Sequence, residues 1–142
     1  YVADRENSRI QIFDRKGNYE NQLGNIHRPS GLAITPGSNP DLIVGELLSY
    51  LEVNKHFPNL GPFLSILNYQ NELLFRLGDK GRPGLLSGQF VSPHSIAYDS
   101  QGNLYVGDVV ETDWKQVFGN LKKPKNIRRF QRFKCSGDWP NK

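Results

Sequence analysis

The sequence Leu-Tyr-Val-Gly-Asp at residues 104–108 has two earlier counterparts, Leu-Ile-Val-Gly-Glu at residues 42–46 and Tyr-Val-Ala-Asp at residues 1–4. Each is a short apolar segment followed by a small residue and a carboxylate, which is typical of a buried β-strand that ends at a polar turn. The carboxylates that fall in register are Asp4, Glu46 and Asp108. This repetition decides the fold, because it indicates that one structural unit occurs three times.

Further predicted strands surround each copy of this segment. Pro-Ser-Gly-Leu-Ala-Ile at residues 29–34 parallels Pro-His-Ser-Ile-Ala-Tyr at residues 93–98, and a turn separates each from the strand that follows. Third strands are predicted at residues 9–13, 64–67 and 127–130, and fourth strands at residues 19–23 and 72–77. The carboxylates in register are about 42 and then about 62 residues apart, and four short strands in each unit of roughly 40 residues are typical of a β-propeller blade.

We therefore predict an all-β fold of the propeller type, made of three partial four-stranded units within residues 1–142 that end near residues 1–26, 27–90 and 91–135. The longer spacing holds two inserts, near residues 55–62 and 79–90. No helical periodicity of comparable strength is found, and residues 116–121 are expected to form one helical turn and no more.

Blades bury their faces only against neighbouring blades, and a propeller closes with at least four of them. Three partial units would leave two faces uncovered, so we expect this chain to be a fragment whose remaining half lies upstream. The chain also starts at Tyr1, inside a predicted strand, and contains no methionine, which agrees with that expectation.

The composition excludes several classes of protein. The 142 residues include 14 glycines and 9 prolines, which fits a chain with many turns, and a hydrophobic fraction of 37% does not fit a disordered one. No run of apolar residues reaches the length of about 18 that a membrane-spanning helix needs, so no span is expected. The single cysteine, Cys135, can form neither an internal disulfide nor a zinc cluster.

The net charge of +4 comes largely from one basic stretch near the C-terminus. Such a stretch could bind nucleic acid, or it could be the solvent-facing side of a late strand, since apolar residues interrupt it. We favour the strand and expect no nucleic-acid partner, because no helix-turn-helix or aromatic stacking motif accompanies the charge. The basic residues are Lys122, Lys123, Lys125, Arg128, Arg129, Arg132 and Lys134.

The segment Tyr-Val-Ala-Asp-Arg-Glu-Asn-Ser-Arg-Ile-Gln-Ile-Phe at residues 1–13 resembles the core of an NHL repeat, and Arg-Pro-Ser-Gly-Leu-Ala at residues 28–33 resembles its entry strand. Within NHL propellers, Ala-Asp-Arg-Glu-Asn at residues 3–7 and Ser-Pro-His-Ser-Ile at residues 92–96 are similar to the peptidyl-α-hydroxyglycine α-amidating lyases, in a bacterial form. The resemblance implies a six-bladed propeller, with this chain as its C-terminal half, that cleaves a peptidyl-α-hydroxyglycine into a peptide amide and glyoxylate.

The same resemblance implies a zinc ion held by three histidines from entry strands, of which this chain contains His94. It implies an active-site role for Arg5, and it favours a secreted or periplasmic location. The other two zinc histidines and the tyrosine associated with catalysis would lie upstream of Tyr1. Ser95 stands where the animal enzymes have a calcium-site aspartate, which argues against a structural calcium ion.

The residues themselves leave alternatives open at both positions. A neutral imidazole is a good zinc ligand, but His94 could also be a hydrogen-bonded residue at a strand start, and the matching residue of the preceding unit is Ser30. The Arg5 guanidinium could bind a substrate carboxylate or stabilise a developing oxyanion. It could instead form a salt bridge with Asp4, Glu6 or a neighbouring blade.

The remaining polar candidates are interpreted as structural. His27 and His56 lie in connections and are expected to pack there. The carboxylates in register recur in every unit, whereas a catalytic pair would not need to, so we expect them to cap turns or to pair with arginines between blades.

Two classes of function follow from these observations. The first is a zinc-dependent lyase in which the metal acts as a Lewis acid on a peptide or small-molecule substrate and Arg5 binds that substrate's carboxylate. The second is a non-catalytic propeller that presents its loops, including residues 55–62 and 115–124, to a protein or glycan partner. RNA binding through the basic stretch is a third hypothesis.

Overall fold

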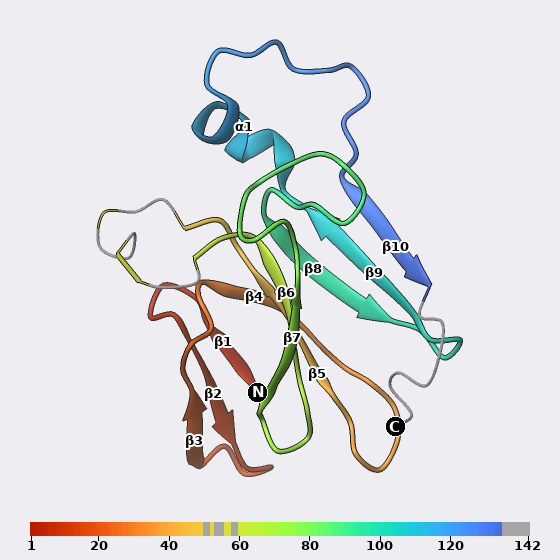
Figure 1. Cartoon of the computed structure of the whole chain (residues 1–142). Helices are drawn as coiled ribbons and strands as arrows, with labels where there is room; N and C mark the ends of the chain where they lie inside the picture. The colour runs from red at the N-terminus through yellow and green to blue at the C-terminus, as the bar shows by residue number, and fades with distance from the viewer. Residues whose placement is uncertain (50–51, 53–55, 58–59, 135–142) are drawn as a thin grey trace.

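The computed structural model describes residues 1–49, 52, 56–57 and 60–134, and these residues form ten β-strands in three antiparallel sheets together with one α-helix. The predicted all-β class is therefore confirmed. Figure 1 shows the sheets in chain order from β1–β3 to β8–β10, with the helix beyond one end of them. Three residues of the first predicted insert (55, 58 and 59) and Cys135, at the predicted end of the last unit, lie outside the described residues.

Each sheet is a simple meander. Sheet 1 contains β1 (Val2–Asp4), β2 (Arg9–Phe13) and β3 (Tyr19–Leu23). Sheet 2 contains β4 (Pro29–Ile34), β5 (Leu42–Glu46), β6 (Phe63–Leu67) and β7 (Leu73–Leu77). Sheet 3 contains β8 (Pro93–Tyr98), β9 (Asn103–Asp108) and β10 (Phe130–Lys134).

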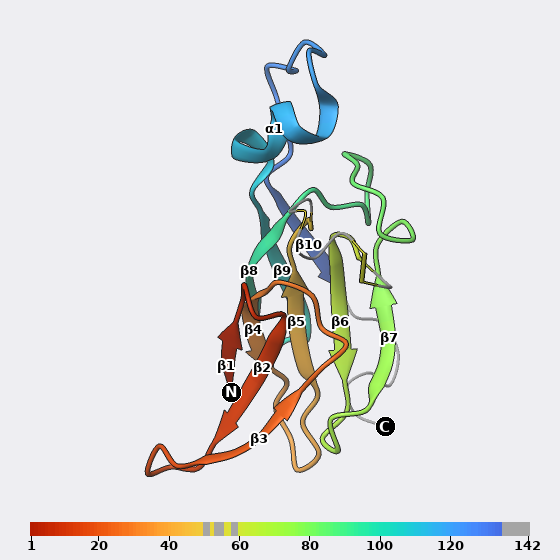
Figure 2. The same ribbon diagram turned by 90° about the vertical axis from the view of Figure 1, so that its left-hand side faces the viewer.

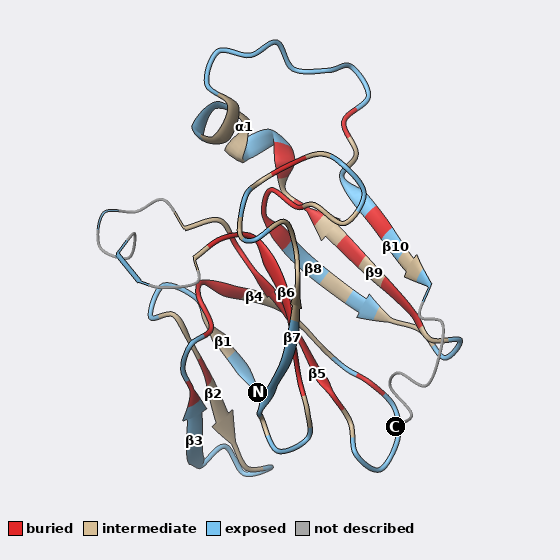
Figure 3. Ribbon diagram, in the orientation of Figure 1, coloured by how far each residue is buried: buried red, intermediate tan, exposed pale blue. Residues whose placement is uncertain are grey.

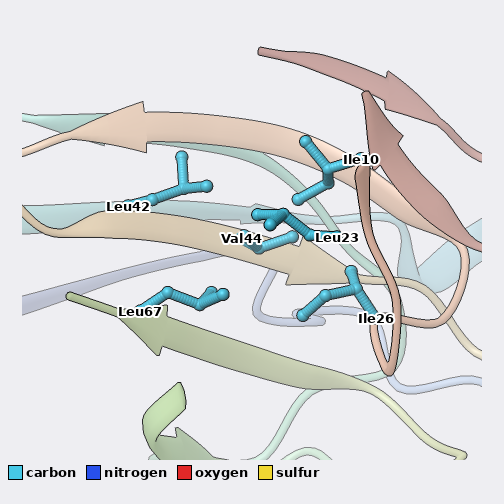
Figure 4. Close-up of a cluster of buried hydrophobic side chains, with 6 residues drawn as sticks. All are labelled: Ile10, Leu23, Ile26, Leu42, Val44 and Leu67. Atoms are coloured by element: carbon cyan, nitrogen blue, oxygen red, sulfur yellow. The ribbon is translucent and has the colours of Figure 1, made fainter. Parts of the chain in front are cut away.

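The central strands of sheet 2, β5 and β6, are buried on both faces, and this explains why β5 begins with three consecutive apolar residues. Side chains alternate across a strand, so Val44 faces sheet 1 and Ile43 faces sheet 3. Every residue of β5 and β6 is buried, as the red central strands of Figure 3 show. The first of the two cores, between sheets 1 and 2, is drawn in Figure 4 and consists of Ile10, Leu23, Ile26, Leu42, Val44 and Leu67.

The second core lies between sheets 2 and 3. Its largest member is Phe90, which is fully buried and leads into β8, and Phe133 from β10 packs against it with ring centroids 6.0 Å apart. The other buried members come from β5, β6 and β9, and are Ile43, Leu64, Ile66, Leu104 and Val106.

The first strands of sheets 2 and 3 lie against each other, and Figure 2 shows β4, β5 and β8 in this arrangement. Glycine makes the close approach feasible. A Cβ atom on Gly31 would lie 2.7 Å from the carbonyl oxygen of His94, and one on Gly45 would clash with the carbonyl oxygen of Pro93. Only residues without a side chain allow the backbones of the two sheets to come this close.

One turn design recurs at residues 14–18, 68–72 and 99–103. In each, the side chain of the first residue accepts hydrogen bonds from the backbone N–H groups of the third and fifth residues, at 2.8–3.0 Å. This is the Asx-turn geometry that Asp and Asn favour. The fourth residue of each turn has a positive φ and is Gly17, Asn71 or Gly102.

Two expectations for the C-terminal part of the chain were wrong. A nine-residue helix, α1 (Val110–Phe118), replaces the single turn expected at residues 116–121, and the last strand is β10 rather than residues 127–130. Ile127 instead packs under the helix with Val91 and Val110. The helix forms because an apolar stripe, completed by Trp114 and Val117, can be buried against this part of the chain.

Candidate functional site

The two ends of the sheets differ in the length of their connections (Figure 1). One end holds the recurrent Asx turns. The other, which we call the loop end, holds the connecting residues 5–8, 24–28, 78–92 and 109–129, including α1. Because functional side chains gather on connections held by a rigid scaffold, the loop end is the candidate functional surface.

Asp108 closes sheet 3 at the loop end. Its carboxylate accepts hydrogen bonds from the backbone N–H groups of Val91, at 2.9 Å, and Ser92, at 2.6 Å. These two residues lead directly into β8, so the carboxylate at the end of β9 fixes where the first strand of its own sheet begins. Burial of the side chain raises the pKa of the Asp108 carboxyl.

Glu46 performs the same task in sheet 2. Its fully buried carboxylate accepts a 2.6 Å hydrogen bond from the backbone N–H of His27, which leads into β4. The hydroxyl of Ser65 and the guanidinium of Arg76, whose Nε lies 3.4 Å from Glu46 Oε1, also contact it. Burial is the largest influence on this group and raises the pKa of the Glu46 carboxyl.

Asp4, the counterpart in sheet 1, has different partners. Its carboxylate accepts 2.8 Å hydrogen bonds from the Nε of Arg9 and the Nδ2 of Asn7. These bonds, with that of Arg9 the larger influence, lower the pKa of the Asp4 carboxyl. All three carboxylates therefore hold backbone or side chains at the loop end, as a structural role requires, but the arginines that Asp4 and Glu46 meet, Arg9 and Arg76, belong to the same sheet and not to a neighbouring one.

His94 occupies a β-bulge at the start of β8. Pro93 pairs with Asp108 and Ser95 with Gly107, so the residue between them has no partner on β9. A bulge turns its side chain away from the regular pleat, and His94 is exposed. A matching irregularity occurs in β4 between Pro29 and Leu32. It contains Ser30, the residue of the preceding unit that occupies the same position as His94.

Arg5 lies in the turn between β1 and β2 and forms an ion pair with Glu6, Nε to Oε1, at 3.0 Å. Both side chains are about half exposed. Glu6 also receives two hydrogen bonds from Arg28, at 2.9 and 3.2 Å, which join the turn of sheet 1 to the start of sheet 2. Arg28 is the main cause that lowers the pKa of the Glu6 carboxyl, and Arg5 adds to it. Of the alternatives left open for Arg5, the structure therefore shows the salt bridge with Glu6.

The structure places Arg5 and His94 at the same end of the sheets. Arg5 lies in the turn of sheet 1 that Glu6 and Arg28 join to sheet 2, and His94 lies at the start of sheet 3. In the part of the chain that the structure describes, no group of three or more His, Cys, Asp or Glu side chains is placed to hold a metal ion. His94 can accordingly be one ligand of a zinc ion only if the other ligands come from outside these residues. The described residues alone do not fit a complete zinc site.

The other two histidines occupy different environments. His27 is buried, and its ring lies 5.7 Å from that of Phe57, centroid to centroid. His56 is exposed. The contact of His27 with Phe57 agrees with the packing role expected for it.

Two arginines at the loop end, the buried Arg28 and the partly buried Arg76, were not identified from the sequence. Arg28 bridges to Glu6 and donates a 2.5 Å hydrogen bond to the carbonyl oxygen of Leu48. Arg76 joins Glu46 to the carbonyl oxygen of Asn25, at 2.6 Å. The signal for Arg28 was its position directly before the proline of an entry strand. Arg76 is the single charged residue of β7, and nothing near it in the sequence marks Glu46, the buried carboxylate that it meets.

The basic stretch is only partly available to solvent partners. Arg129 and Lys123 pair with Glu111 of α1, and Arg128 donates to the carbonyl oxygens of Leu85 and Leu86. These cations therefore join α1 and the connection before β8 to the segment that leads into β10.

No protein-family model matches the chain, and no curated protein matches it at a significant level. Within the described residues, no helix has the length and apolar character needed to cross a membrane.

Proposed function

We propose that these three sheets are consecutive blades of an NHL-type β-propeller and that its loop end carries the functional site. The proposal is supported by the antiparallel meander of each sheet, by the stacking of β4 on β8 and by the carboxylate that recurs at the end of each unit. The two-sided burial of sheet 2 is what a blade inside a ring requires.

We further propose that the activity of this propeller is zinc-dependent cleavage of a peptidyl-α-hydroxyglycine to a peptide amide and glyoxylate. The single observation that carries the proposal is the bulge at His94, which presents an exposed imidazole from an entry strand at the loop end. Zinc, when bound, would supply a Lewis acid at the substrate's hydroxyl oxygen. His94 would hold it together with ligands from outside the described residues.

Arg5 would bind the carboxylate of the substrate's α-hydroxyglycine unit. Its guanidinium is half exposed and already pairs with a carboxylate, that of Glu6. Exchange of this partner for a substrate carboxylate costs little, because exposed ion pairs contribute only about 0–1 kcal/mol. The bidentate contact of Arg28 would keep Glu6 in place meanwhile.

A second candidate function is a non-catalytic scaffold that binds a protein or another ligand. It is favoured by the ion pair that Arg5 already makes and by the gathering of the long connections at one end. Loops held on a rigid set of sheets are a common way to present a binding surface.

The experiment that separates the two is glyoxylate release from a model peptidyl-α-hydroxyglycine by the natural polypeptide, with and without a zinc chelator. Turnover that the chelator removes, and that His94→Ala abolishes while His56→Ala leaves it unchanged, supports the lyase. His56 is a suitable control because it is an exposed histidine outside the sheets. Absence of turnover with zinc supplied, or full activity of His94→Ala, would contradict the lyase and favour the non-catalytic scaffold.

A further inference from the structure

One connection carries the whole net charge of the chain. Residues 109–129, which join β9 to β10 and include α1, contain six basic and two acidic side chains, and their net charge of +4 equals that of all 142 residues. The remaining residues therefore sum to zero. A charge asymmetry of this kind indicates a segment that meets an anionic partner. The charged residues of the connection are Lys115, Lys122, Lys123, Lys125, Arg128, Arg129, Glu111 and Asp113.

This connection, which we call the basic projection, stands away from the rest of the molecule. Figures 1 and 2 show α1 and the loop after it beyond the loop end of the sheets. The helix packs on Val91, which precedes β8, and the indole N–H of Trp114 donates a 2.9 Å hydrogen bond to the carbonyl oxygen of Leu121. The projection is therefore held in place and is open to a large, flat partner.

Two cations of the loop after α1 are free to meet such a partner. Lys122 and Lys125 are exposed, and neither makes a hydrogen bond or an ion pair with another described residue. The guanidinium groups of the projection are engaged, Arg129 with Glu111 and Arg128 with backbone carbonyl oxygens. The available charge is thus that of lysines, which act as point charges, rather than that of arginines, which recognise phosphates by bidentate contact.

The two most exposed large hydrophobic side chains among the described residues lie at the same end of the molecule. Leu121, 67% exposed, directly precedes the lysines of the projection, and Leu86, 71% exposed, belongs to the connection before β8. Arg128 donates to the carbonyl oxygen of Leu86 and so joins the two connections. Exposed aliphatic side chains beside lysines match the boundary between the headgroups and the acyl chains of a lipid bilayer.

A nucleic acid is a poorer partner for this surface. Single strands are bound through aromatic side chains on which bases stack, and duplexes through arginines or a helix whose first turn enters a groove. In the projection, Trp114 and Phe118 are partly buried and pack on each other with ring centroids 4.5 Å apart, and the first turn of α1 is acidic. Free lysines with exposed leucines are instead the combination that binds anionic lipid.

We propose that the basic projection attaches the protein to the surface of an anionic lipid bilayer. Lys122 and Lys125 lie among the headgroups, and Leu121 inserts at their boundary with the acyl chains. The contact is peripheral and uses neither Arg5 nor His94, so it does not depend on whether the activity is that of a lyase or of a binding scaffold.

The test is binding of the 142-residue chain to sedimented vesicles of phosphatidylcholine, with and without about 30% phosphatidylserine. Only vesicles that contain phosphatidylserine should bind the chain, and a rise in NaCl from about 0.1 M to about 0.5 M should weaken the binding by screening the lysines. Lys122→Gln combined with Lys125→Gln should lower the partition coefficient roughly 25-fold, since each lysine near an anionic surface contributes about a factor of five. Leu121→Ser should lower it roughly fivefold or more.

Two matched controls lie at the opposite, turn end of the sheets. Arg15→Gln combined with Lys16→Gln removes the same charge, and Ile34→Ser removes an aliphatic side chain that is 53% exposed. Both should bind vesicles as the unchanged chain does, and thermal unfolding checks that every variant remains folded. An equal loss of binding in the charge-matched control would show that net charge alone causes the binding, and would overturn the proposal. Equally strong binding to phosphatidylcholine alone would overturn it as well.

Tryptophan fluorescence reports which part of the chain meets the vesicle. In a Trp139→Phe background, Trp114 is the single tryptophan, and its bond to the carbonyl oxygen of Leu121 places it beside the proposed point of insertion. Its emission should shift to shorter wavelength on vesicles that contain phosphatidylserine, and binding without a shift would contradict the proposal. Tighter binding to a single-stranded RNA oligonucleotide, with the same dependence on Lys122 and Lys125, would assign the surface to nucleic acid and also overturn it.

Discussion

The surroundings of each recurrent carboxylate, rather than its position in the repeat, determine whether its pKa is raised or lowered. Glu46 and Asp108 are buried against the backbone N–H groups that lead into the first strand of their sheets, and burial raises the pKa of each. Asp4 has the same place in the repeat, yet its bonds from Arg9 and Asn7 lower its pKa. Buried acceptors of this kind support the backbone, so their removal should cost more than the loss of a surface charge.

Glu46→Ala should lower the free energy of unfolding by about 3 kcal/mol, because the buried N–H of His27 would lose its acceptor and the guanidinium of Arg76 its counter-ion. Urea denaturation measures this directly. The matched control is Glu72→Ala on the exposed turn before β7, where a change within about 0.5 kcal/mol is expected. Equal effects of the two substitutions would show that Glu46 does not hold the entry to β4.

Asp99 gives a prediction about pH. Hydrogen bonds, first from Asn103, lower the pKa of its carboxyl to about 2 from a usual value of 3.8. A carboxyl with a depressed pKa in the folded state stabilises the protein above the unfolded value, and this stabilisation is lost as the pH falls from about 4 towards 2. Asp99→Asn, which copies the Asn68 turn, should keep the fold at pH 7 and remove this part of the acid sensitivity.

The measurement for Asp99 is the difference in unfolding free energy between wild type and Asp99→Asn at several pH values from 2 to 7. Because other carboxyls titrate in both proteins, only the difference is informative. A constant difference across that range would contradict the assigned cause.

The sequence located the candidate residues but not their partners. His94 was identified because a histidine follows the proline of an entry strand, and its exposure follows from a bulge that no residue pattern announces. The ion pair of Arg5 with Glu6 was one of the open alternatives. The contact of Arg28 with Glu6 joins residues 22 positions apart in the chain and depends on how sheets 1 and 2 stack, which local patterns do not contain.

At the scale of the elements, alternation and turn chemistry predicted most strands, and the C-terminal part shows where they fail. The helix starts with Val109 at its N-cap position and has no side-chain cap, so the sequence there carried no signal for a helix start. The apolar spacing of Val110, Trp114 and Val117 was the helical signal, but it is short and its burial depends on Val91 and Ile127, which are distant in sequence.

The recurrent Asx turns give a test of one element. At the fourth turn position, Gly17 has φ 87° and Asn71 has φ 66°. Gly17→Ala should cost about 1 kcal/mol, because a Cβ atom disfavours this conformation, whereas Asn71→Gly should be neutral or slightly stabilising. Urea denaturation of the two variants checks both, and a Cβ on Gly17 meets no atom within 4 Å that could confuse the result. Loss of stability in Asn71→Gly would mean that the Asn71 side chain, which accepts a bond from the Tyr1 hydroxyl, matters more than its backbone.

At the scale of the whole molecule, the two hydrophobic cores share sheet 2, so the three sheets should unfold together. Leu23→Ala in the first core and Leu104→Ala in the second should each cost about 2–5 kcal/mol and lower the same single transition. Calorimetry together with circular dichroism would check this. Separate transitions, each sensitive to only one of the two substitutions, would show that the sheets are independent.

The division between a loop end and a turn end has a consequence for how such a chain diverges. Sheets 2 and 3 are each closed by a carboxylate at the end of the second strand, Glu46 or Asp108, so insertions and deletions in the loop-end connections leave this closure intact. Evolution can therefore lengthen one unit by many residues without disturbing its neighbours, as the unequal spacing of Asp4, Glu46 and Asp108 illustrates. A sequence search for this repeat should align the strand-and-carboxylate segment and allow gaps of any length between copies. A search that assumes a constant repeat length would not detect units of unequal length.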